Sequence, residues 1–177
     1  MKQIHMKVLE FEENDINSFQ DFCSFIKNFI TKYFETVNEI DMDPMSFFCY
    51  SPGTLYFVVP LEFSREDKIP NFLSVKEFCR RSNIDYLGCI TMGEMRKVGI
   101  PSIQEEQIGM YYHQIKEFFD PVDVVWVQCV NFKTKEIDGF GWELEGDTPK
   151  PLDIGGDNLG KYCTFYDIFV GDDRELN

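Results

Sequence analysis

The chain has 177 residues, of which 44% are hydrophobic and 27% are charged. This length and composition are typical of one globular domain with a sizeable core, and they exclude a disordered or fibrous protein. The 17 lysines and arginines face 31 aspartates and glutamates, so the formal net charge is -14. Because binding to nucleic acid or anionic lipid relies on cationic side chains, we expect no direct nucleic-acid contact and no membrane contact.

Cysteine spacing and the first residues indicate the compartment. Residues 1–11 include charges and lack the apolar run of a signal peptide, so we expect no export. The six cysteines lie singly, without a C-x-x-C pair, which is typical of small buried side chains in a reducing, cytoplasmic protein. Since His5 and His113 alone cannot form a three-histidine zinc site, we expect no metal site and no cofactor.

The first two predicted elements are a strand and a long helix. Apolar and polar residues alternate over 3–11, which is the pattern of a half-buried strand. Apolar residues then recur at three and four residue steps over 16–37, which predicts a helix of about 22 residues. Asn14 or Asp15 is placed to cap its first turn.

A hairpin is predicted next, with arms at 46–50 and 54–63. Pro52 and Gly53 stand between them at the two central positions of a type II turn. Proline sets φ near -65° and glycine accepts a positive φ, so this pair favours a tight reversal. The second arm is expected inside the sheet, with Pro60 directing its far end toward an edge.

Two further helices are predicted from capping boxes, in which a serine precedes a glutamate by three residues. The first box, Ser74–Glu77, opens a short helix that ends near Arg81, and a strand follows over 84–92. The second box, at 102–105, opens a helix with apolar residues at helical spacing through Phe119.

The remaining segment reads as strands joined by turns. The valine-rich residues 122–132 predict a central strand that reverses into a second strand at 137–145. Residues 146–161 are rich in glycine, proline and acids and predict a loop. A last strand is expected over 162–170, followed by a frayed acidic end at 171–177.

These elements predict one α+β domain spanning 1–177, with a mostly antiparallel sheet of about six or seven strands packed by two long helices and one short helix. The segments 1–66 and 84–145 both follow a βαββ order. In outline this order resembles the GyrI-like small-molecule-binding domains, which pair two βαββ units around a pocket. The resemblance carries no shared motif and implies no functional residues.

The acidic excess is concentrated near the end of the chain, where three basic residues face eleven acidic ones from Glu136 onward. A solvated face is the simple interpretation, and a surface complementary to a basic protein is the functional one. We therefore expect a soluble protein-binding module, an inhibitor or immunity-type (anti-defence) antagonist of a basic or nucleic-acid-handling partner. The expected acidic surface comprises Glu136, Asp138, Glu143, Glu145, Asp147, Asp153 and Asp157.

A small-ligand-binding domain is the alternative. Its aromatic-lined pocket, between the two βαββ segments, would draw on Tyr112, Trp126, Trp142 and Tyr166. A basic spot near Arg80, Arg81, Arg96 and Lys97 either caps helix ends and pairs with acids or receives an anionic small ligand.

Catalytic motifs are scarce. The sequence contains no G-x-S-x-G and no G-x-x-x-x-G-K-[ST] pattern. A hydrolase or metal enzyme using His113 with a cysteine, or the Glu143 and Glu145 pair on one strand face, is the weaker hypothesis. We name no catalytic residue and expect a protein that binds rather than catalyses.

Overall fold

The computed structural model describes residues 2–12, 15–37, 40, 42–62, 64–95, 121–145, 148–152 and 164–171. Their elements in chain order are β1 (Ile4–Leu9), α1 (Phe19–Thr36), β2 (Met45–Ser51), β3 (Thr54–Pro60), η1 (Arg65–Asp67), α2 (Lys68–Arg81), β4 (Tyr86–Met95), β5 (Val122–Asn131), β6 (Ile137–Glu143), β7 (Lys150–Leu152) and α4 (Thr164–Phe169). The helix predicted over 102–119 lies outside the described residues, as do residues 172–177 of the frayed end predicted over 171–177.

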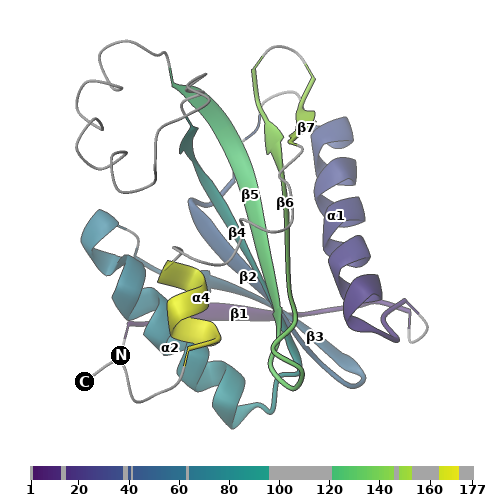
Figure 1. Ribbon diagram of the computed structural model, residues 1–177, viewed down its shortest axis with the longest axis vertical. Coiled ribbons are helices and arrows are strands. Elements are labelled where there is room, and N and C mark those ends of the chain that lie inside the picture. The colour runs from purple at the N-terminus through teal and green to yellow at the C-terminus, as the bar shows by residue number, and fades with distance from the viewer. Residues whose placement is uncertain are drawn as a thin grey trace, which may run out of the picture.

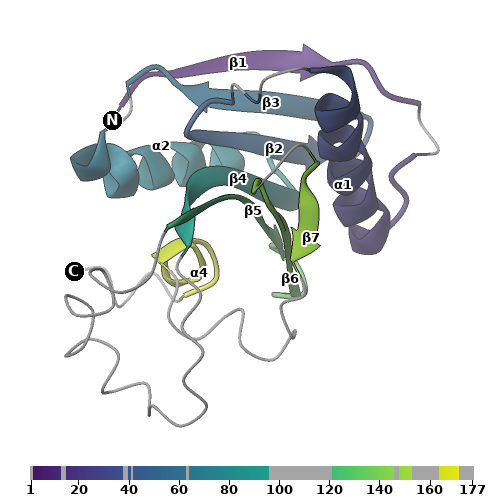
Figure 2. The ribbon, with the colours of Figure 1, turned by 90° about the horizontal axis from the view of Figure 1, so that it is seen from above.

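One antiparallel sheet of seven strands organises the molecule, in the order β1-β3-β2-β4-β5-β6-β7 (Figure 1). Helix α1 covers one face of this sheet, and α2 and α4 cover the other (Figure 2). An amphipathic helix and a sheet each bury one apolar side, so the three layers enclose two cores. The predicted α+β class is confirmed.

The two predicted βαββ segments differ in strand order. In the first, β3 lies between β1 and β2 and is antiparallel to both, so β1 and β2 are parallel and α1 connects them. In the second, β4, β5 and β6 are neighbours in chain order, each antiparallel to the next. A shared order of elements therefore does not make these segments structural repeats.

Helix α1 begins later than predicted. Its N-cap is Ser18, whose hydroxyl accepts a hydrogen bond from the Asp21 N–H at 3.1 Å, so neither Asn14 nor Asp15 is the cap. The helix buries five side chains against the sheet, namely Phe19, Phe22, Cys23, Ile26 and Ile30. Their spacing is the stripe that predicted this helix.

The predicted hairpin is confirmed as β2 and β3. Gly53 has φ of 78°, the left-handed conformation that the third position of a type II turn requires. Pro60 is the last residue of β3 and lies opposite Ile4 of β1. Since β1 also pairs with β3, β3 lies inside the sheet and β1 forms the edge.

Helix α2 begins at Lys68, so the predicted capping box at Ser74–Glu77 lies in the middle of the helix. Pro70 fits the first turn because the first four N–H groups of a helix have no partner inside the helix. The Ser74 hydroxyl donates to the Pro70 carbonyl at 3.0 Å and accepts from the Lys2 N–H at 2.9 Å. Ser74 thus joins α2 to the start of β1 instead of capping a helix.

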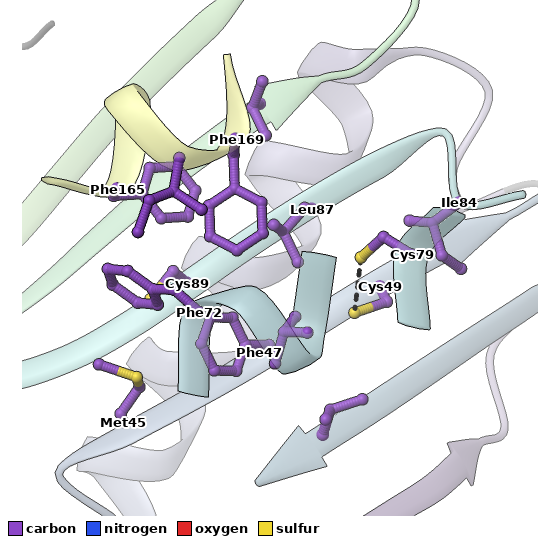
Figure 3. Packing of buried hydrophobic residues seen from close by; sticks show 14 of the residues in the cluster. Met45, Phe47, Cys49, Phe72, Cys79, Ile84, Leu87, Cys89, Phe165 and Phe169 are labelled. Atoms are coloured by element: carbon purple, nitrogen blue, oxygen red, sulfur yellow. Dashed lines mark hydrogen bonds between the residues drawn. The ribbon is translucent and has the colours of Figure 1, made fainter. Parts of the chain in front are cut away.

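The strand predicted over 162–170 is wrong, because residues 164–169 form helix α4. Phe165, Tyr166, Ile168 and Phe169 fall on one helical face and are buried there. Figure 3 shows the rings of Phe165 and Phe169 packed toward Phe72 of α2. The predicted loop at 146–161 also contains the three-residue strand β7, which was not expected.

Candidate functional site

The predicted acidic surface is divided in the structure. Glu136 and Glu145 are exposed, but Glu136 precedes β6 and Glu145 follows it, so the length of this seven-residue strand, roughly 20 Å, lies between them. Asp138 is half-buried and accepts a hydrogen bond from the Gly139 N–H at 2.8 Å. Asp147, Asp153 and Asp157 lie outside the described residues.

Glu143 does not belong to a solvent face. It is only 5% exposed and lies opposite Val124 of β5, on the side of the sheet that α2 and α4 cover. Glu145 is exposed and follows the end of β6. The two carboxylates predicted on one strand face therefore differ in exposure, and only Glu145 is open to solvent.

The predicted aromatic pocket is not assembled by the residues that the structure describes. Trp142 packs in the core beneath α1, with its ring 5.5 Å from that of Phe34. Tyr166 packs in the core beneath α2, and its hydroxyl donates to the Asp138 carbonyl at 3.2 Å. The sheet separates these two side chains. Half-buried Trp126 lies opposite Gly141 and so faces away from Trp142; Tyr112 is outside the described residues.

The described cysteines are core residues. Cys23, Cys49, Cys79, Cys89 and Cys129 are free thiols and buried, as the sequence predicts. Burial raises the pKa of the Cys49 thiol, and the neighbouring Cys79 raises it further. Within the described part of the chain, no group of three histidine, cysteine, aspartate or glutamate side chains is arranged to hold a metal ion. A buried thiol with a raised pKa, such as that of Cys49, is a poor nucleophile, because the thiolate is the reactive form.

The edge of the sheet at β1 is the feature that binding chemistry fits best. Gln3 accepts a hydrogen bond from the Leu61 N–H at 3.1 Å, and antiparallel pairing alternates bonded and non-bonded residues. The backbone groups of Ile4, Met6 and Val8 consequently point away from β3. Pro60, which lacks an N–H, lies opposite Ile4 in agreement with this register. Figure 2 shows β1 along the outer edge of the sheet.

Side chains on this edge are apolar and exposed. Met6 is 47% exposed and Val8 is 58% exposed, and both belong to the face of β1 that α2 shares. Strand β1 itself contains no proline and its ladder with β3 runs without a bulge, and its charged side chain, Lys7, lies on the other face from Met6 and Val8. Natural edge strands are usually blunted by such features, so a regular and partly apolar edge is a template for pairing with another strand.

Carboxylates lie at both ends of this edge. At the end of β1 the exposed Glu10 and Glu12 are followed by Asp15, which accepts the Glu12 N–H at 3.3 Å. At the start, Lys2 bridges Glu62 and Asp67 at 3.0 and 2.8 Å. Hydrogen bonds from Lys2 and Ser64 lower the pKa of Asp67, so this carboxylate stays ionised.

An acidic groove continues from the Asp15 side onto α1. It has a volume of about 310 Å³ and is lined by Asp15 and Asp21 at one end and by Phe25 and Phe29 along the helix. Phe29 is 43% exposed and its ring lies 5.2 Å from that of Phe48. Apolar rings beside carboxylates suit a segment that is both apolar and cationic.

Sequence reasoning found the alternation of Ile4, Met6 and Val8 but named no residue of β1 as a site. The signal was present, because an apolar row next to a run of acids begins the chain. The position of β1 at the sheet edge depends on its pairing with β3, about fifty residues away in the chain.

Comparison of the chain with protein-family models, with curated proteins and with solved structures finds no match in any of the three. Among the described helices, none is both long enough and apolar enough to span a bilayer.

Proposed function

We propose that this protein is a binding module for another protein, and that it receives an extended basic segment of its partner along the β1 edge. The observation that carries the proposal is the outward row of backbone N–H and C=O groups at Ile4, Met6 and Val8. A segment added there extends the sheet through main-chain hydrogen bonds, as in other cases of strand addition.

Charge supports a basic partner over a second copy of the chain. Two copies would each bring a net charge of -14 and would place Glu10 and Glu12 of one near Glu62 and Asp67 of the other. A segment with alternating apolar residues and flanking lysines would instead set cations near the acids at both ends. Electrostatic steering of this kind raises the association rate and rejects acidic competitors.

Inhibition follows from this mode of binding. A basic segment held along β1 is no longer accessible to phosphate, so a nucleic-acid-handling partner that depends on the segment loses its function. The proposed role is therefore that of an antagonist or immunity-type protein. It rests on the edge geometry and the charge, and no longer on the acidic residues of β6.

The test uses two labelled peptides and measures fluorescence anisotropy. Both peptides alternate valine with threonine; one carries lysines at its ends and the other carries glutamates. We expect the lysine peptide to bind and to weaken as salt rises, because exposed charges are screened. Met6→Pro removes an outward N–H without breaking the β1–β3 ladder and should cost about tenfold in affinity.

Matched variants keep the test decisive. Val8→Lys places a like charge on the edge and should also weaken binding of the lysine peptide. Ile137→Lys is the matched control, because Ile137 is an exposed apolar residue of β6, far from β1 in the strand order, and this change should leave binding nearly unchanged. Folding of each variant is checked by circular dichroism. Equal binding by folded Val8→Lys and wild type would show that the β1 edge is not the site. Equal binding of the glutamate peptide would show that the partner segment is not selected by its positive charge.

A further inference from the structure

A cleft of about 650 Å³ opens between α2, α4 and the turn that joins β5 to β6. Its apolar floor includes Ile84, Phe132 and Phe169, and Leu73 of α2 forms part of its wall. Ile84 and Phe169 are buried, whereas Leu73 is 43% exposed. A cleft of this size, with an apolar floor and a few polar groups, is typical of small-molecule sites.

The rim of the cleft is cationic in a chain that is strongly acidic overall. Lys76 and Arg80 of α2 line one side, and Lys135 lines the other. Among the described residues of the lining, Glu77 carries the single carboxylate, and it is shared by Arg80 and Arg81 through hydrogen bonds of 2.6 to 2.9 Å. Among the lining residues that the structure describes, positive charge therefore exceeds negative charge.

Lys135 is held on the rim by its turn. The buried Asn131 accepts hydrogen bonds through its side chain from the Lys133 and Thr134 N–H groups, at 3.0 and 3.2 Å. Its carbonyl accepts the Lys135 N–H at 2.9 Å. Lys135 has φ of 61°, a conformation that lysine seldom adopts. Its side chain makes no ion pair within the described residues, so its ammonium group is available to a ligand.

We propose that this cleft binds a small amphipathic carboxylate, with its hydrocarbon part against Ile84, Phe132 and Phe169 and its carboxylate beside Lys135 and Arg80. Apolar burial supplies affinity, and the cations select an anionic head group over a neutral or cationic one. The cleft shares no residue with the β1 edge, so this inference stands independently of the proposed function.

Calorimetric titration with decanoate, below its micelle concentration, tests the proposal. Decanol and decyltrimethylammonium serve as neutral and cationic probes of the same chain length. We expect decanoate to bind most tightly, and Lys135→Gln to weaken it about tenfold through the loss of a charge-assisted contact. Lys133→Gln is the matched control, since Lys133 pairs with Asp85 at 2.7 Å and does not line the cleft.

A second variant tests the apolar wall without disturbing the core. Leu73→Asp introduces a carboxylate at an exposed position of the cleft and should abolish decanoate binding. Amide chemical shifts of the wild type should change around residues 132–135 when decanoate is added. Decanoate binding that is absent, that is unchanged in both Lys135→Gln and Leu73→Asp, or that decanol matches would overturn the proposal.

Discussion

Ile26 of α1 lies directly over Gly88 of β4. A Cβ atom built on Gly88 would overlap Ile26 Cδ1 and would also touch Cys129 Sγ at 3.4 Å. The absence of a side chain at Gly88 thus lets the helix approach the sheet. Ile26 and Cys129 are both fully buried, so neither side chain can move aside without shifting α1 relative to the sheet.

Gly88→Ala should therefore destabilise the protein, by about 1 to 3 kcal/mol, through overpacking between α1 and the sheet. The measurement is the free energy of unfolding in urea. Gly93→Ala is the matched control on the same strand, because a Cβ there meets nothing within 4 Å. Equal stability of the two variants would contradict the close packing of Ile26 on Gly88.

Phe72 lies at the centre of the core between the sheet and the helices α2 and α4. Its ring lies 6.0 Å from Phe47, 6.0 Å from Phe165 and 5.6 Å from Phe169 (Figure 3). Phe72→Ala should cost about 3 to 5 kcal/mol, since it leaves a cavity between α2 and α4. The exposed Ile69→Ala on the same helix should change stability by less than about 0.5 kcal/mol in thermal unfolding.

The two arginines beside Glu77 should make the stability of the protein depend on pH. Hydrogen bonds from Arg80 and Arg81 lower the pKa of Glu77 from 4.5 to about 2. A depressed carboxyl pKa stabilises the folded state above the unfolded-state value and loses that effect as the pH falls toward the folded-state value. Glu77→Gln should hence lower the melting temperature slightly at pH 7, with a difference that shrinks between pH 4.5 and 2.

The reference for that experiment is Glu66→Gln, since Glu66 is exposed and accepts no hydrogen bond within the described residues. Its melting temperature should follow that of the wild type at every pH. A Glu77→Gln difference that persists undiminished at pH 2 would show that the arginine contacts do not stabilise the fold.

Substitutions at Lys135 test whether its positive φ strains the backbone. Because Lys135 is held at φ of 61°, Lys135→Gly should leave the free energy of unfolding unchanged or raise it by up to about 1 kcal/mol. The gain is limited because glycine is more flexible in the unfolded chain. Lys135→Val should destabilise, since a branched side chain fits this conformation worst. Chemical denaturation of the three proteins gives the order. A valine variant as stable as the glycine variant would mean that the turn relaxes to a negative φ.

Thiol reactivity tests the cysteine placement. Burial and the neighbouring Cys23 raise the pKa of Cys129, as burial and Cys79 do for Cys49. The sixth cysteine, Cys163, lies outside the described residues and is replaced by serine in this test. The five remaining thiols should then react with a disulfide reagent only as fast as the protein unfolds. A rapid reaction of even one equivalent in the native state would show that one of them is accessible.

Local patterns predicted the elements whose form depends on neighbouring residues in the chain. The spacing of Phe22, Ile26 and Ile30 predicted α1, and Pro52 with Gly53 predicted the hairpin turn, because helical periodicity and turn conformation are local properties. The pattern at 162–170 failed because a short apolar run fits either a strand or a helix. In helix α4 this segment packs the rings of Phe165 and Phe169 on Phe72, a contact that depends on residues distant in the chain.

Candidate sites were predicted less well than the elements. Glu143 and Glu145 were read from sequence as partners on one face, yet one is buried and the other is exposed beyond the strand. The basic cleft joins Arg80, Lys135 and Phe169, which are distant in the chain. No local pattern shows that residues so far apart line one opening.

The sequence by itself determined the α+β class, the apolar faces of β1 and α1, and the net charge of -14, since composition and periodicity carry this information. Only the tertiary structure decided that β1 is an edge strand while the similarly alternating β3 lies inside the sheet. The physical reason is that exposure depends on which distant strand or helix completes the packing of a face. An apolar row such as Ile4, Met6 and Val8 is core or docking surface according to what lies beside it.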